Sequence, residues 1–89
     1  MINKKSFKLS IIIPCYNENQ TIDKIISKIS ESLSTYNYLN YELIIVDDNS
    51  TDGTKDKLKK YDLDKNINVF FHNKNLGKGA AIQSAIKHV

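Results

Sequence analysis

The chain has 89 residues, a formal net charge of +3, 40% hydrophobic residues and 26% charged residues. This length suits one small domain spanning 1–89, and the composition excludes a disordered tail and a membrane protein. A single cysteine, Cys15, excludes an intramolecular disulfide. All the basic residues are lysines, which disfavours a nucleic-acid partner because bidentate recognition of bases and phosphates favours arginine.

The N-terminal part of the chain carries no targeting or membrane signal. Its apolar stretch, residues 9–13, is too short for the core of a signal peptide. No segment approaches the roughly 20 apolar residues that a membrane span needs. We therefore expect a cytoplasmic protein, which would work at the cytoplasmic face of a membrane only through parts not present in this chain.

The first predicted elements are a strand and a helix. Residues 8–13 form a short β-branched run that favours a buried strand, and we expect Pro14 to end it. A helix should begin within 17–21, where Asn and Thr offer N-cap oxygens. Its amphipathic character rests on apolar residues at helical spacing: Ile22, Ile25, Ile26, Ile29, Leu33 and Tyr36.

The middle of the chain repeats this alternation. Residues 37–40 are predicted to be a loop, and residues 41–46 a second buried strand. The polar segment 47–50 ends that strand. Residues 51–61 are predicted to be a short polar helix, with little apolar surface beyond Leu58 and Tyr61.

The last third contains a strand, a turn and a helix. Residues 67–71 are apolar and β-branched or aromatic, and predict a third strand. A polar turn with two glycines follows over 72–79. Residues 80–89 are predicted to form a helix whose apolar face carries Ile82, Ala85, Ile86 and Val89.

This order of elements, β-α-β-α-β-α, predicts a three-layer, Rossmann-like parallel sheet. Strands separated by helices need crossover connections, which are almost always right-handed, and the expected strand order is 3-2-1. Ligands of such sheets bind outside the carboxyl ends of the strands. We therefore expect the polar segments 14–18, 47–50 and 72–79 to lie at one edge.

The first of these segments offers groups that suit a nucleoside. Tyr16 provides a flat ring for stacking on a base, and Asn17 and Glu18 provide acceptors for a base edge or for ribose hydroxyls. The alternative is purely structural: Pro14 ends the strand, and Asn17 or Asn19 caps the helix. Both interpretations can hold together.

The second segment contributes two adjacent carboxylates, Asp47 and Asp48. Neighbouring side chains diverge on an extended chain, so one can contact a base or ribose while the other caps the next helix. The alternative is a solvated turn. A metal site is disfavoured, because no further carboxylate or histidine lies close in sequence.

The third segment places Lys78 between two glycines at the start of a helix, where its charge opposes the helix dipole. A bound anion such as a pyrophosphate would explain both features, although an ordinary turn with a solvated lysine remains open. The P-loop and the dinucleotide-binding fingerprint are both absent. His72 and His88 are isolated, and we interpret Cys15 as a small apolar filler rather than a nucleophile.

These three segments carry a family resemblance. Residues 9–18 (LSIIIPCYNE), 42–54 (ELIIVDDNSTDGT) and 75–81 (NLGKGAA) resemble the N-terminal part of family 2 glycosyltransferases. Within that family they are most similar to the branch that transfers mannose or glucose to dolichyl or polyprenyl phosphate. The motifs occur in the same order and cover nearly the whole chain.

The resemblance implies part of a GT-A fold that binds a UDP- or GDP-linked sugar for inverting transfer to a polyprenyl phosphate or saccharide acceptor. By position, Pro14, Tyr16 and Glu18 would hold base and ribose, Asp47 would accept from the base with Asp48 supporting the turn, and Lys78 would approach the base or the phosphates. The family binds Mg²⁺ or Mn²⁺ through an Asp-x-Asp motif that would lie beyond Val89, so neither a metal ligand nor a catalytic residue is assigned in this chain.

Three further expectations follow from this interpretation. The 89-residue piece should be inactive alone, because the acceptor half and the general base are absent. An uncovered strand edge and helix face should cause self-association or low stability. The alternative function is a non-catalytic α/β nucleotide-binding or interaction module, in which the turn residues are only caps.

Overall fold

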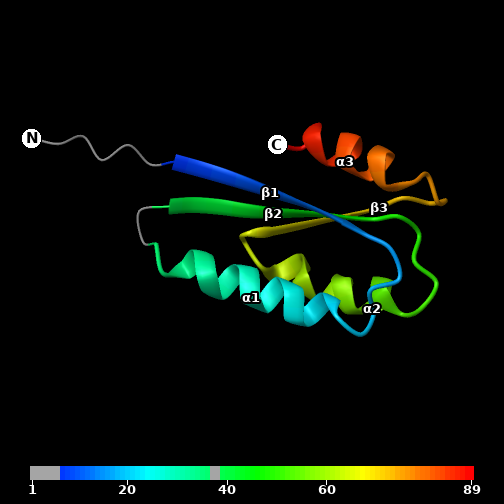
Figure 1. Cartoon of the computed structure of the whole chain (residues 1–89), viewed down its shortest axis with the longest axis horizontal. Coiled ribbons are helices and arrows are strands. Elements are labelled where there is room, and N and C mark those ends of the chain that lie inside the picture. Colours follow the sequence, from blue (N-terminus) through cyan, green and yellow to red (C-terminus); the bar gives the residue numbers. More distant parts are fainter. Residues whose placement is uncertain (1–6, 37–38) are drawn as a thin grey trace, which may run out of the picture.

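The computed structural model describes residues 7–36 and 39–89. Three strands alternate with helices along this part of the chain (Figure 1). The part of the predicted loop 37–40 that precedes residue 39 lies outside the described residues, and residues 39 and 40 already belong to a strand. The elements are β1 (Phe7–Cys15), α1 (Ile22–Ser34), β2 (Leu39–Asp47), α2 (Thr54–Lys59), the 3-10 helix η1 (Lys60–Leu63), β3 (Ile67–Phe71) and α3 (Lys78–Ile86).

The sheet is parallel throughout, and its strand order is β1-β2-β3. Ile13 pairs with Ile45, which pairs in turn with Val69 on β3. The central strand β2 is the most buried, with a run of four apolar side chains at 0% exposure from Leu43 to Val46. Such a continuous apolar run is typical of a strand that is covered on both faces. The predicted α/β class, element order and strand order are confirmed.

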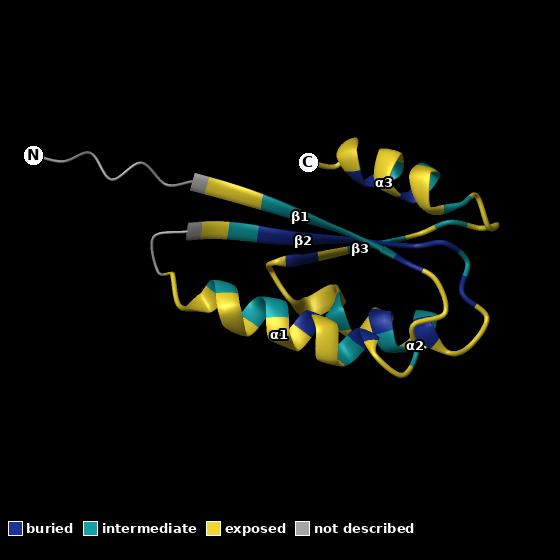
Figure 2. Cartoon of the chain, viewed as in Figure 1, coloured by how far each residue is buried: buried dark blue, intermediate teal, exposed yellow. Residues whose placement is uncertain are grey.

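Helices cover both faces of the sheet. Helices α1 and α2 lie on one side and α3 on the other, so the molecule has three layers (Figures 1 and 2). Alternate residues of β2 point to opposite faces, which divides the apolar residues into two cores. The α1/α2 core contains Cys15, Ile22, Ile26, Leu43, Ile45, Leu58 and Ile67, and the α3 core contains Ile44, Val46, Ala81 and Ala85.

Several predicted boundaries were wrong. Helix α3 spans Lys78–Ile86 rather than 80–89, and β2 spans Leu39–Asp47 rather than 41–46. Strand β1 does not stop before Pro14 but continues through it to Cys15, with Pro14 opposite Val46. Proline suits an edge strand, because its fixed φ is compatible with extended backbone and every second N–H of such a strand needs no partner. In the described sheet β1 is an edge strand. The 51–61 helix is also shorter than predicted, since it begins at Thr54 and tightens into η1 from Lys60.

Two helix faces also differ from the prediction. On α3 the buried residues are Ala81 and Ala85, whereas Ile82 and Ile86 are 36% and 57% exposed. Small alanine side chains allow the α3 backbone to lie close to β1 and β2, and this close approach outweighs the burial of larger residues on the neighbouring face. On α1, Ile22 and Ile26 are buried as predicted, while Ile25 is exposed. Tyr36 was predicted on the same helix face, but it is exposed and lies beyond the end of α1 at Ser34.

Among the described residues, no helix combines the length and the apolar character needed to cross a membrane.

Candidate functional site

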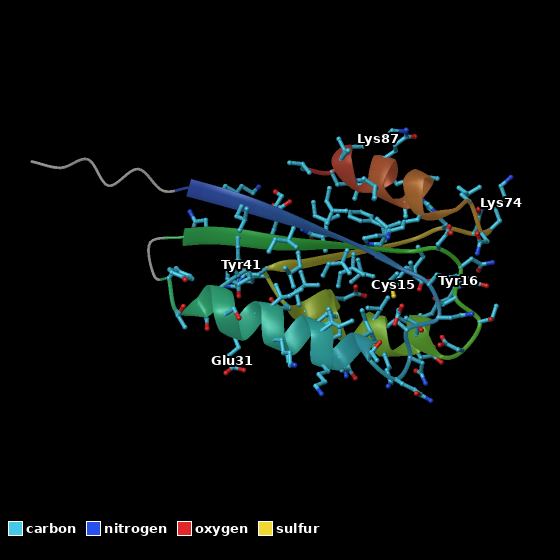
Figure 3. All side chains as sticks on the ribbon, in the orientation of Figure 1. Cys15, Tyr16, Glu31, Tyr41, Lys74 and Lys87 are labelled. Carbon is cyan, nitrogen blue, oxygen red and sulfur yellow. The ribbon has the colours of Figure 1, made fainter. Side chains whose placement is uncertain are left out.

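The three segments that follow the strands meet at the carboxyl edge of the sheet, as predicted. Two backbone hydrogen bonds extend the strand pairing into them: the Asp48 N–H donates to the Cys15 carbonyl at 2.8 Å, and the His72 N–H donates to the Asp47 carbonyl at 2.8 Å. Cys15, Tyr16 and Lys74 accordingly lie at the same end of the molecule (Figure 3). The parallel topology therefore brings together residues from three distant parts of the chain.

A cavity of about 330 Å³ opens between these segments. This volume lies in the range of small-molecule sites. Five of the seven predicted site residues line it, and Asn17 and Asp47 do not. The complete lining is Pro14, Cys15, Tyr16, Glu18, Asp48, Asn75, Gly77, Lys78 and Ala81.

Asn17 and Asp47 instead hold the loops in place. Asn17 has a left-handed backbone, with φ of 53°, and its Oδ1 accepts the Thr51 N–H at 2.8 Å. Asp47 is fully buried. Its two carboxylate oxygens accept the Ser50 hydroxyl at 2.5 Å and the Ser50 N–H at 2.9 Å. The aspartate to which the sequence assigned a base contact thus shapes the turn behind the cavity.

Three side chains after β2 bind three consecutive N–H groups of the first loop. Ser50 Oγ accepts the N–H of residue 17 at 2.8 Å, Thr54 Oγ1 accepts that of residue 18 at 3.0 Å, and Asp52 Oδ2 accepts that of residue 19 at 3.1 Å. We call Ser50, Asp52 and Thr54 the loop clamp. The sequence pattern predicts only a turn and a cap over this stretch, because the partners in the first loop lie 33 to 36 residues away.

The loop clamp is itself held by hydrogen bonds. The Thr54 hydroxyl and N–H both donate to Asp52 Oδ1. These bonds, led by the Thr54 hydroxyl and supported by the N–H of Asn19, hold the pKa of Asp52 below its ordinary value despite partial desolvation. Gly53, between them, has φ of +100°, a left-handed conformation that favours glycine. The first loop is therefore fixed by an ionised, locally satisfied turn.

Asp48 connects the second loop to the third. Its Oδ1 accepts the Leu76 N–H at 2.8 Å and lies 2.9 Å from His72 Nδ1, and its Oδ2 accepts the Gly77 N–H at 2.8 Å. Burial acts to raise the pKa of Asp48, but the hydrogen bonds from Leu76, His72 and Gly77 outweigh it and hold the pKa below its ordinary value. The cavity therefore contains a buried, ionised carboxylate.

His72 is the residue that sequence reasoning missed. It looked isolated in the sequence, yet its side chain is only 11% exposed and joins two elements. Nδ1 contacts Asp48, and Nε2 lies 2.9 Å from the Ser84 hydroxyl on α3. Because Asp48 is ionised and can only accept, Nδ1 carries the proton and donates. The only sequence signal was its position directly after β3, among the segments expected at the binding edge.

The other cavity residues differ in accessibility. Tyr16 is 46% exposed at the rim, and Lys78 is exposed as the first residue of α3. Cys15 is 2% exposed; burial, together with the negative charges of Asp47, Glu18 and Asp52, raises the pKa of its thiol to about 12. A thiol that resists ionisation is a poor nucleophile, which agrees with the interpretation of Cys15 as an apolar filler.

The described residues do not form a metal site: no group of three or more His, Cys, Asp or Glu side chains is placed to hold an ion. The single Asp-x-Asp sequence, Asp62-Leu63-Asp64, precedes β3 and so lies away from the carboxyl edge of the sheet. There Asp64 Oδ1 accepts the Asn66 N–H at 2.8 Å in a local turn.

Comparison with known proteins identifies the family. A family model described as Glycosyl transferase family 2 matches residues 10–89. The chain belongs to this family. It is 34% identical over 80 residues to a dolichol-phosphate mannosyltransferase of Pyrococcus furiosus, and this alignment covers 90% of the chain and 22% of the relative. It is 35% identical over 96 residues to the dolichyl-phosphate β-glucosyltransferase ALG5A of Trichomonas vaginalis, and this alignment covers 94% of the chain and 28% of the relative.

Two solved structures share the fold. The mannosyltransferase PcManGT of Pyrobaculum calidifontis, solved in complex with GDP-Man and Mn²⁺, has a TM-score of 0.76 at 27% identity over 91% of this chain and 24% of that one. S. aureus TarS has a TM-score of 0.73 at 27% identity, covering 92% and 14%. The predicted partial GT-A architecture is therefore confirmed. The chain spans 22% to 30% of the length of the curated relatives.

Proposed function

We propose that this chain is the nucleotide-recognising part of a glycosyltransferase and binds a nucleoside-diphosphate sugar, UDP- or GDP-linked, in the cavity at the carboxyl edge of the sheet. The observation that carries the proposal is the convergence there of three loops that supply an exposed aromatic ring, a buried carboxylate and an exposed lysine. This is the combination that a base, a ribose and a diphosphate require. Family membership supports the same assignment.

The lining suggests a role for each residue. Tyr16, at the rim beside Pro14, would stack on the base, and Glu18 would accept from ribose hydroxyls. We assign the base contact to Asp48 rather than Asp47, because Asp48 lines the cavity whereas Asp47 is fully buried and does not line it. Lys78 would neutralise the diphosphate. Asn17 and Asp47 would act indirectly, by holding the loops.

The rest of the reaction would depend on chain that is not present here. We propose inverting transfer of the sugar to a polyprenyl phosphate or saccharide acceptor, at the cytoplasmic face of a membrane where such a lipid is available. The relatives named for dolichol phosphate and the Mn²⁺ in PcManGT support an acceptor and a divalent cation of this kind for the whole enzyme. The 89 residues alone would bind the donor and transfer nothing. The exposed apolar face of α3 would favour self-association of the chain.

Nucleotide titration tests the binding proposal. We expect UDP or GDP to shift the amide resonances of Tyr16, Asp48 and Lys78 selectively, with ADP weaker. Resonances near Leu63, which is 94% exposed and remote from the carboxyl edge, should stay unchanged. Absence of binding by all three nucleotides at millimolar concentration would refute the proposal and favour a non-catalytic interaction module.

A matched pair of lysine variants tests the diphosphate contact. Lys78→Met should weaken UDP or GDP binding by about tenfold or more, because a hydrogen bond to a charged group contributes about 1.5–3 kcal/mol. Lys74→Met removes a charge from the same loop but not from the cavity lining and should change the affinity less than about twofold. Equal losses in the two variants would show only a general attraction by positive charge.

A further inference from the structure

The acceptor capacity of Asp48 is almost used up by the protein itself. An ionised carboxylate offers about four lone-pair positions, two on each oxygen. Oδ1 already accepts from the Leu76 N–H and from His72 Nδ1, and Oδ2 accepts from the Gly77 N–H. One position therefore remains, on Oδ2, for a ligand in the cavity that Asp48 lines.

His72 is held so that its Nδ1 keeps one of the two acceptor positions on Asp48 Oδ1 occupied. Its ring lies between Asp48 and Ser84, with 2.9 Å on each side. With the proton on Nδ1, Nε2 accepts the Ser84 hydroxyl. The ring is thus fixed by a strand end on one side and by helix α3 on the other, and its donor cannot turn away from Asp48 without losing both bonds.

Nucleobases differ in how many donors they present to a carboxylate. The pairing edge of guanine has two adjacent donors, N1–H and the 2-amino group, which match a carboxylate with both oxygens free. The pairing edge of uracil has one donor, N3–H, between two carbonyl oxygens. A carboxylate with one free acceptor position satisfies uracil and leaves one guanine donor unmatched, and an unmatched buried donor costs binding free energy.

We propose that His72 determines the base preference of this site by leaving Asp48 a single acceptor, so that the cavity selects a uracil nucleotide over a guanine nucleotide. This inference rests on the proposed nucleotide-binding function and narrows it to UDP-linked donors. His72 acts through Asp48 and is a positioning residue. Its effect is a change in the ratio of two affinities, which a merely structural role would not produce.

Ligand variation on the unmodified chain gives the first test. We expect UDP to bind at least about tenfold more tightly than GDP, the loss caused by one unmatched donor. Inosine diphosphate lacks the 2-amino group and presents only N1–H, so it should bind about tenfold more tightly than GDP. Equal affinity for IDP and GDP, or tighter binding of GDP than of UDP, would overturn the inference. Failure of every nucleotide to bind would instead refute the proposed function.

Variants of His72 give the second test. His72→Leu frees one position on Oδ1 and should bring the GDP/IDP ratio of dissociation constants close to one. His72→Asn places an amide donor near the former Nδ1 and should keep the unmodified ratio. An unchanged ratio in a folded His72→Leu protein would contradict the inference, and an equal weakening of both nucleotides would leave His72 only a structural role. If His72→Leu does not fold, the comparison of IDP with GDP on the unmodified chain still decides.

Discussion

The loop clamp can be tested at Thr54. The variant Thr54→Val keeps the shape of the side chain and replaces only its hydroxyl by a methyl group. Thr54 is fully buried, and its Oγ1 accepts the Glu18 N–H at 3.0 Å while donating to Asp52. Valine leaves the Glu18 N–H without its partner, at a cost of about 1–3 kcal/mol. Loss of the bond to Asp52 adds less, because that carboxylate is exposed and can be hydrated. We expect a total loss of about 2–4 kcal/mol.

Urea unfolding, followed by far-ultraviolet circular dichroism, measures this loss. A domain of this size has a free energy of unfolding of only about 4–13 kcal/mol, so the variant loses a large share of it. With a urea dependence of about 1 kcal/mol per molar, the unfolding midpoint should fall by about 2 M or more. Nucleotide affinity should also fall, because Glu18 lines the cavity.

Thr54→Ser is the matched control, since it keeps the hydroxyl and removes only a buried methyl group. It should lose about 1 kcal/mol. If Thr54→Val proves as stable as Thr54→Ser, the hydroxyl is not holding the first loop, and the loop clamp would not be needed to explain how the cavity is built.

Three further predictions concern the core and the titrating groups. At pH 8, Cys15 should react with a thiol reagent far more slowly in the native chain than in urea. Because the pKa of its thiol rises from 9.0 to about 12 on folding, the free energy of unfolding should decline between about pH 9 and about pH 12. Asp48 has a lowered pKa, so its contribution to stability should be present above pH 3.8 and be lost as pH falls through the folded pKa; Asp48→Asn should therefore flatten the acid limb of the stability profile. Ala81→Leu should destabilise by about 1–3 kcal/mol or more, whereas Ile82→Ala, at a position 36% exposed, should cost less.

Each of these three has a result that would contradict it. Native-state labelling of Cys15 as fast as labelling in urea would show that the thiol is accessible. An acid limb that is unchanged in Asp48→Asn would mean that other carboxylates carry the acid dependence. A larger loss in Ile82→Ala than in Ala81→Leu would mean that α3 packs on its isoleucine face after all.

The sequence alone determined the class of fold and the edge of the sheet at which the three polar segments meet. The segments that form β1, β2 and β3 are apolar and rich in β-branched residues, and helical segments separate them. Parallel pairing follows, because strands joined through a helix almost always pair in parallel through a right-handed crossover. The carboxyl ends of parallel strands share one edge, and the polar segments after them had to meet there. These conclusions depend on local pattern and chain connectivity, which a sequence displays directly.

Only the tertiary structure decided which side chains face the cavity. Asp47 and Asp48 are adjacent and chemically identical, and their roles separate because Ser50 takes one while Leu76, Gly77 and His72 take the other. The buried alanine face of α3 likewise follows from how closely the helix approaches β1 and β2. Contacts of this kind join residues far apart in the chain, and neither hydrophobic periodicity nor motif spacing predicts which of these residues come within bonding distance.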